Sequence, residues 1–195
     1  MTFLPDYRMA PEFPYPAALD DAREVYRALL EVADVDRLLV AGDSGGGGLT
    51  ASLLEDLPKS RFPQPAGAIL FSPEVDLALT GASVRVNAPR DILPDDIPVE
   101  PYLQGVDPHD PEVSPLYADL GGYPPLLVTC GGDEMFRDEV RGFVERATGA
   151  GVDVDYYEAE EMEHVFEILS PLARSSTVAF EDVRRFASRI LAGRH

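Results

Sequence analysis

The chain lacks several features that define large classes of protein. It contains a single cysteine, Cys130, among 195 residues, so no disulfide can form within it, which fits a reducing compartment. No apolar run approaches the length that crosses a bilayer, and the first residues lack the basic and then apolar pattern of a secretion signal. Together these absences predict a cytoplasmic protein.

Basic residues are also scarce. Only 16 Lys and Arg stand against 35 Asp and Glu, which gives a net charge of −19. A field of this sign repels nucleic acid and anionic membrane surfaces, so neither is an expected partner. Apolar residues make up 45% of the chain, which is enough for one packed domain over residues 1–195.

The most informative segment that is present runs from Val40 to Leu49 and reads V-A-G-D-S-G-G-G-G-L. It contains the pattern G-x-S-x-G centred on Ser44, between a short apolar stretch and a predicted helix. In that context the pattern is typical of the nucleophile elbow of α/β-hydrolases. A serine at a tight, strained turn leaves no room for side chains two residues to either side, so Gly42 and Gly46 suit those places.

Hydrophobic periodicity predicts strands that alternate with helices along the chain. The predicted strands cover residues 2–7, 37–41, 68–71, 126–130 and 152–157. The predicted helices cover residues 17–33, 45–57, 99–103, 136–148 and 177–192. This alternation predicts an α/β fold, a mostly parallel sheet with helices on both faces. Gly149 is expected just past its helix, where a left-handed cap suits glycine.

The stretch 73–125 differs from the rest, because it is rich in proline and aspartate and has little periodicity. Loops of this length in a compact domain are usually functional or disordered. We expect residues 73–125 to form a long excursion over the C-terminal edge of the sheet.

A serine nucleophile needs a base, and the chain has three histidines. His195 is the last residue, and His109 lies in a turn-rich segment. His164 follows the last predicted strand. Loops at the carboxyl ends of parallel strands gather at one edge of the sheet, which also holds Ser44. His164 is therefore the predicted base.

The acid that orients the base should follow the preceding strand, where Asp133 and Glu134 stand side by side. Asp133 is the predicted acid. Glu134 and Asp138 are the local alternatives, and Asp138 is expected to face solvent from its helix. The resulting order of serine, acid and histidine is that of α/β-hydrolases.

Two other patterns overlap the serine segment. Residues 42–46 also look like the active-serine stretch of trypsin-like proteases, but those need a histidine and an aspartate earlier in an all-β chain, and no histidine precedes Ser44. Residues 46–51 fit a loose G-x-G-x-x-A dinucleotide pattern. That reading leaves His164 and the elbow spacing unexplained.

Four stretches carry a resemblance to a known family. They are D-Y-R-M-A-P-E-F-P-Y-P-A-A at 6–18, G-D-S-G-G-G-G-L at 42–49, the acid segment at 132–138 and H-V-F at 164–166. From end to end the chain resembles the hormone-sensitive-lipase-like family of bacterial esterases, within the α/β-hydrolases. Glycine stands at positions 45 and 48, where the family has alanine and asparagine.

The resemblance implies hydrolysis of small-molecule carboxylic esters with short acyl chains, without metal or cofactor. Ser44 would attack the ester carbonyl, His164 would move the proton, and Asp133 would hold the imidazole. The backbone N–H of Gly45 would donate to the oxyanion.

The chain also departs from the family's pattern. The family carries an H-G-G-G segment, whose backbone supplies further oxyanion donors, as well as first strands and an N-terminal cap that this sequence lacks. We therefore expect slow catalysis. We also expect the strand at 37–41 to pair either with residues 2–7 or with a second copy through an open edge. The alternative function is that of a non-catalytic remnant or binding module of the same fold.

Overall fold

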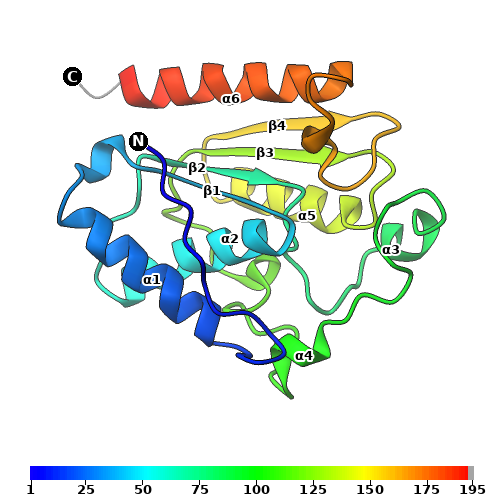
Figure 1. The fold of residues 1–195 in the computed structure, drawn as a ribbon, viewed down its shortest axis with the longest axis horizontal. Coiled ribbons are helices and arrows are strands. Elements are labelled where there is room, and N and C mark those ends of the chain that lie inside the picture. Colours follow the sequence, from blue (N-terminus) through cyan, green and yellow to red (C-terminus); the bar gives the residue numbers. More distant parts are fainter. Residues whose placement is uncertain (193–195) are drawn as a thin grey trace.

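The computed structural model describes residues 1–192, and the predicted parallel sheet is present (Figure 1). Its four strands are β1 (Leu39–Asp43), β2 (Gly67–Phe71), β3 (Leu126–Gly131) and β4 (Val154–Ala159). They pair in the order β1-β2-β3-β4, and every pair is parallel. The carboxyl ends of all four strands therefore meet at one edge of the sheet.

Helices cover both faces of this sheet, as the alternation in the sequence predicts. The long ones are α1 (Ala17–Leu30), α2 (Ser44–Lys59), α5 (Arg137–Gly149) and α6 (Arg174–Ala192). Figure 1 shows α6 on one face and α1, α2 and α5 on the other. The α/β-hydrolase fold class is confirmed.

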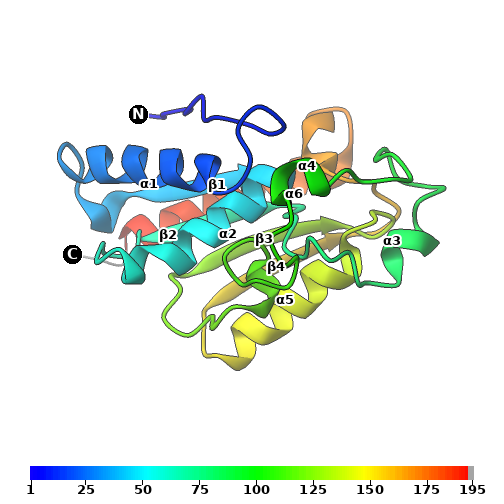
Figure 2. The same cartoon turned by 90° about the horizontal axis from the view of Figure 1, so that it is seen from below.

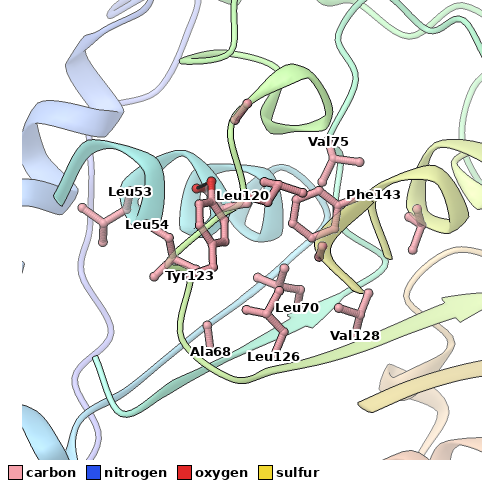
Figure 3. Close-up of a cluster of buried hydrophobic side chains, with 14 of the residues drawn as sticks. Leu53, Leu54, Ala68, Leu70, Val75, Leu120, Tyr123, Leu126, Val128 and Phe143 are labelled. Atoms are coloured by element: carbon pink, nitrogen blue, oxygen red, sulfur yellow. Dashed lines mark hydrogen bonds between the residues drawn. The ribbon is translucent and has the colours of Figure 1, made fainter. Parts of the chain in front are cut away.

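Alternation of side chains along the inner strands explains this layering. Leu70 and Val128 face the helices α2 and α5, and Figure 3 shows them packed below Leu54 and Phe143. Residues one position along, such as Ile69, pack instead against α6. Burial of apolar surface on both faces fixes the ends of β2 and β3 in place.

Residues 2–7 form no strand, so the prediction for this segment is wrong. β1 pairs with β2 alone among the described strands. Residues 3–7 instead lie beside β1 and α1 around a groove of about 330 Å³. Pro5 has no N–H to donate to a ladder, and Leu4 is 92% exposed, so neither hydrogen bonding nor burial favours an added strand.

The left-handed glycine predicted at position 149 is instead Gly151, two residues further along the chain. Gly149 is still the last residue of α5, and Gly151 is the residue with positive φ, at +85°. The helix continues because the Ala150 N–H still finds acceptors at Arg146 and Ala147.

The excursion at 73–125 contains short helical elements. They are α3 (Ser83–Val86), α4 (Glu100–Leu103) and the 3₁₀ turn η2 (Pro115–Tyr117). Two further 3₁₀ turns lie elsewhere, η1 (Val35–Arg37) and η3 (Phe166–Leu169). Figure 2 shows α3 beyond the carboxyl ends of the strands and α4 beside the start of α2. The boundaries drawn for this excursion and for one domain over 1–195 stay predictions. None of the described helices is both long and apolar enough to cross a membrane.

Candidate active site

Ser44 is the first residue of α2 and directly follows β1. Its φ of +52° lies in the left-handed region, which residues other than glycine rarely adopt. A Cβ at Gly42 would overlap the carbonyl of Gly46, so the turn requires glycine there. The serine is thus held at a strained strand-to-helix turn, as the sequence predicts.

The expectation that Gly46 is equally crowded is wrong. A Cβ at this position would meet only the Tyr7 hydroxyl, at 3.7 Å. The close approach occurs one half-turn later, where a Cβ on Gly48 would overlap the backbone carbonyl of Glu74. Gly48 is therefore the glycine that α2 needs in order to pack closely against the segment after β2, whereas the turn itself does not require glycine at position 46.

His164 lies in the loop between β4 and η3, and its Nε2 is 2.8 Å from Ser44 Oγ. The ring is 3% exposed and packs edge-on against Phe136, with ring centroids 5.1 Å apart. The structure therefore brings together Ser44 and His164, which lie 120 residues apart in the sequence.

Burial lowers the pKa of His164, and the nearby carboxylates of Asp91 and Asp43 oppose that effect. The imidazole is consequently neutral at pH 7, with a lone pair on one nitrogen. If Nε2 accepts a hydrogen bond from the Ser44 hydroxyl group, the proton of the neutral ring is on Nδ1. Nδ1 then needs a hydrogen-bond acceptor of its own.

The nearest buried acid to Nδ1 is Glu134, whose Oε2 lies 4.0 Å away. Within residues 1–192, His164 Nδ1 and Glu134 Oε1 are both buried and without a hydrogen-bond partner. Leaving such groups unpaired costs about 1–3 kcal/mol each. Catalytic hydrogen bonds in unliganded enzymes are often long and tighten when substrate binds. The geometry thus sets a buried donor facing a buried acid.

Two hydrogen bonds hold the Glu134 carboxylate in position. Its Oε2 accepts from Ser72 Oγ at 2.6 Å and from the Gly131 N–H at 2.8 Å. Ser72 Oγ in turn accepts from the N–H of Val165, the neighbour of the histidine, at 3.0 Å. Burial raises the pKa of Glu134 to about 8, and the bonds from Ser72 and Gly131 oppose that rise. An imidazolium forming nearby would favour the charged carboxylate further.

The structure does not bring Asp133, the predicted acid, to the histidine. Its side chain is 30% exposed and pairs with Arg90 at 3.3 Å. Asp138, the other alternative, pairs with Arg137 and accepts from the N–H of Ser83. The two adjacent acids therefore have different surroundings: Asp133 pairs with Arg90, whereas Ser72 and Gly131 donate hydrogen bonds to Glu134.

Asp91 is a site residue that the sequence did not single out. Its Oδ1 accepts from the backbone N–H of His164 at 2.9 Å, and its Oδ2 accepts from the backbone N–H of Met135 at 2.6 Å. It therefore ties the histidine loop to the acid loop. No pattern marks it, because it is one of many aspartates in the excursion.

The backbone N–H of Gly45, the predicted oxyanion donor, belongs to the second residue of α2. The first N–H groups of a helix have no acceptor within it, and the positive end of the helix dipole favours an anion there.

His109 takes no part in the site: it is exposed and pairs with Asp107. His195 lies outside the described residues. In the described part of the chain, no three His, Cys, Asp or Glu side chains form a group that could hold a metal.

A parallel sheet that carries a serine on a left-handed elbow, with a histidine on its hydroxyl, defines the α/β-hydrolase class. Comparison with known proteins agrees, because the family described as alpha/beta hydrolase fold matches residues 1–168. The chain belongs to this family and, within it, to the hormone-sensitive-lipase-like bacterial esterases.

Individual relatives are similar over most of this chain. An acetyl-hydrolase of Streptomyces hygroscopicus is 41% identical over 90% of this chain and 60% of its own length. An esterase of Acinetobacter venetianus is 36% identical, over 95% of this chain and 63% of its own. The crystal structure of the hormone-sensitive-lipase homologue EstE7, from a metagenome library, superposes with a TM-score of 0.91 at 39% identity, over 95% of this chain and 66% of that one. The chain thus spans about 60% of the length of these curated relatives.

Proposed function

We propose that this chain hydrolyses carboxylic esters with short acyl groups. One observation carries the proposal: a histidine nitrogen lies 2.8 Å from the hydroxyl of a serine held on a left-handed elbow. The esterase and acetyl-hydrolase names of its relatives support the same chemistry.

In the first half of the proposed reaction, Ser44 Oγ attacks the ester carbonyl carbon as its proton passes to His164 Nε2. The carbonyl oxygen becomes an oxyanion and accepts from the Gly45 N–H. The tetrahedral intermediate then collapses, the bond to the alcohol oxygen breaks, and His164 returns the proton to the leaving alcohol. Ser44 is left acylated.

In the second half, water takes the place of the alcohol. His164 accepts a proton from the water as its oxygen attacks the acyl carbon. The second tetrahedral intermediate collapses, the bond to Ser44 Oγ breaks, and the serine recovers its proton from His164. The carboxylic acid leaves, and the enzyme is as it began.

We assign the orienting role to Glu134 in place of Asp133. A carboxylate beside Nδ1 fixes the tautomer that leaves Nε2 free, and it stabilises the imidazolium that forms in both halves. The 4.0 Å separation from Nδ1 and the complete burial of Glu134 support this assignment. Asp133 is partly exposed and pairs with Arg90, and it has no such contact with the histidine.

The rate is proposed to be limited by the oxyanion site. Gly45 offers one donor there, and no histidine of this sequence is followed by three glycines. Loss of one oxyanion donor typically lowers kcat by about 10²–10³-fold. The 195-residue chain is therefore expected to turn over esters slowly but measurably.

The test is hydrolysis of p-nitrophenyl acetate and butyrate by the chain, by Ser44→Ala and by Ser60→Ala, a control at the far end of α2. The proposal predicts that Ser44→Ala alone falls to the rate of buffer. Equal rates for wild type and Ser44→Ala would remove the esterase function and leave the alternative, a non-catalytic binding module.

A further inference from the structure

A cavity of about 210 Å³ adjoins the elbow, and Gly45, the residue after Ser44, is part of its lining. It runs along α2, where Gly45, Gly48 and Ser52 line it, and Tyr7 and Tyr102 close it from the N-terminal segment and from α4. Most of its remaining wall is apolar. Glu74 is the one acidic side chain in it, and no basic residue lines it.

The position of Glu74 is tied to the nucleophile. Its N–H donates to the carbonyl oxygen of Ser44 itself, at 3.0 Å. Its Oε2 lies 3.5 Å from the point where a Cβ of Gly45 would stand. The carboxyl group therefore sits beside the residue whose N–H is the proposed oxyanion donor, within reach of a group a few bonds from the reacting carbonyl.

The Glu74 residue is partly buried, and its carboxyl group forms no hydrogen bond with any side chain or backbone group of residues 1–192. Burial raises its pKa to about 7, and its charge in turn helps to raise the pKa of Tyr102. A carboxyl group is costly to bury without a donor. Glu134 and Asp91, the carboxylates beside His164, both accept hydrogen bonds, whereas the Glu74 carboxyl group accepts none from the described residues and can accept one from a molecule in the cavity.

From this arrangement we infer that the Glu74 cavity selects esters that carry a hydrogen-bond donor, a hydroxyl or an ammonium group, in the half of the substrate that enters it. The inference rests on the proposed esterase function and names its substrate class. Glu74 acts as a specificity-determining residue: it accepts from the substrate's donor and takes no part in bond making or breaking. An apolar analogue would occupy the same cavity and leave the carboxyl group unpaired.

The experiment compares esters that differ only by a hydroxyl in place of a methyl group. In one arm the change is in the acyl half, p-nitrophenyl 3-hydroxybutyrate against p-nitrophenyl 3-methylbutyrate. In the other it is in the alcohol half, 3-hydroxypropyl acetate against butyl acetate. Each kcat/KM is divided by the ester's rate of hydrolysis in buffer, which removes intrinsic reactivity, and the arm with the larger preference identifies the half that enters the cavity.

We expect wild type to prefer the hydroxylated ester by about tenfold or more in one arm, the size of a hydrogen bond to a charged group. Glu74→Leu should bring that ratio close to one, and Glu74→Gln, which keeps the shape and an acceptor, should retain part of it. Glu181→Gln, an equal loss of charge on the exposed face of α6, should leave the ratio unchanged. Ratios that stay within about twofold of wild type in Glu74→Leu, in both arms, would overturn the inference.

A second readout separates this inference from the esterase proposal. Ser44→Ala cannot turn over the esters, so their binding to it can be followed by ligand-observed NMR, with Ser44→Ala/Glu74→Leu as the comparison. If Ser44→Ala binds the hydroxylated ester more tightly and Ser44→Ala/Glu74→Leu does not, the role of Glu74 in the cavity stands even if wild type proves inactive. Active wild type without any such preference would leave the esterase function standing and remove the inference.

Discussion

The two flanks of Ser44 differ sharply in how completely the chain builds them. On the packed flank, formed by the loops after β2, β3 and β4, His164 is 3% exposed and Glu134 is fully buried. On the open flank, formed by β1 and residues 3–7, Phe3 is 54% and Leu4 is 92% exposed. The buried histidine and acid lie on the first flank, and the second borders a groove where, within residues 1–192, β1 pairs with no strand other than β2. The contrast shows that the histidine beside Ser44 is held by closely packed loops, whereas the β1 side of the serine borders an open groove.

The largest expected effect tests which acid completes the packed flank. Glu134→Gln should lower kcat for p-nitrophenyl acetate by about 10³–10⁴-fold, because Nδ1 would lose the carboxylate that fixes the tautomer. Asp133→Asn, the matched change one residue earlier, should alter kcat by less than about threefold, since its carboxylate contacts Arg90 on the surface. Circular dichroism of both variants controls for folding. The reverse ranking would return the role to Asp133.

The next effect concerns the elbow that joins the two flanks. Gly42→Ala should lower the free energy of unfolding by more than about 2 kcal/mol, because its Cβ overlaps the Gly46 carbonyl. Gly46→Ala should raise it by up to about 1 kcal/mol, because the site has room and alanine favours the helix. Urea unfolding of the pair measures both. Similar losses in the two variants would mean that the turn is crowded on both sides after all.

A third effect concerns Glu74, which lies in the loop after β2 and lines the same cavity as Tyr7 of the open flank. Its pKa is raised to about 7 from 4.5. A raised pKa means that the folded state binds the Glu74 proton more tightly than the unfolded state does. The stabilisation of the folded state by this proton is full below about pH 4.5 and is lost as pH rises through about 7. Glu74→Gln should remove that loss.

The measurement is the free energy of unfolding at about pH 5 and about pH 8, in wild type and in Glu74→Gln. We expect the decrease between these pH values to be smaller by about 2 kcal/mol in the variant, after allowance for the partial exposure of the cavity. An equal decrease in both proteins would show that Glu74 is solvated well enough to titrate normally.

The smallest effect concerns association through the open flank. We expect copies to pair at the β1 edge, against the repulsion of a −19 charge, so added salt should strengthen association by screening. Leu4→Lys should weaken it. Leu172→Lys is the matched control, because Leu172 is 91% exposed and lies in the segment between η3 and α6. Sedimentation velocity over a range of concentration and salt measures both, and a monomer at every condition would contradict the expectation.

The difference between the flanks also explains what the sequence could predict. Ser44 and His164 follow from a turn pattern and from the rule that strand ends meet at one edge, both of which are local or topological. The choice between Asp133 and Glu134 depends on which way one turn faces, and the donors that decide it, Ser72 and Gly131, are distant or backbone groups. No local pattern carries that information.

Other differences have the same origin. Asp91 reaches the site only because the excursion folds back over the strand ends, and nothing in the aspartate-rich sequence separates it from its neighbours. Residues 2–7 have the composition of a strand, but a strand forms only where a partner edge and a buried face accept it. The strands and helices packed on both sides were therefore predicted to within a few residues, as was the short helix α4 in the excursion, while residues 2–7 and the position of Asp91 were not.

The most direct test of the account is whether Ser44 becomes acylated. The chain is mixed with p-nitrophenyl acetate, quenched in acid within the first turnover and digested for mass spectrometry, with Ser44→Ala and Ser60→Ala treated in parallel. We expect an acetyl group on the peptide that contains Ser44, present in wild type and Ser60→Ala and absent from Ser44→Ala. Release of p-nitrophenol by wild type with no acetyl group on Ser44 would contradict it.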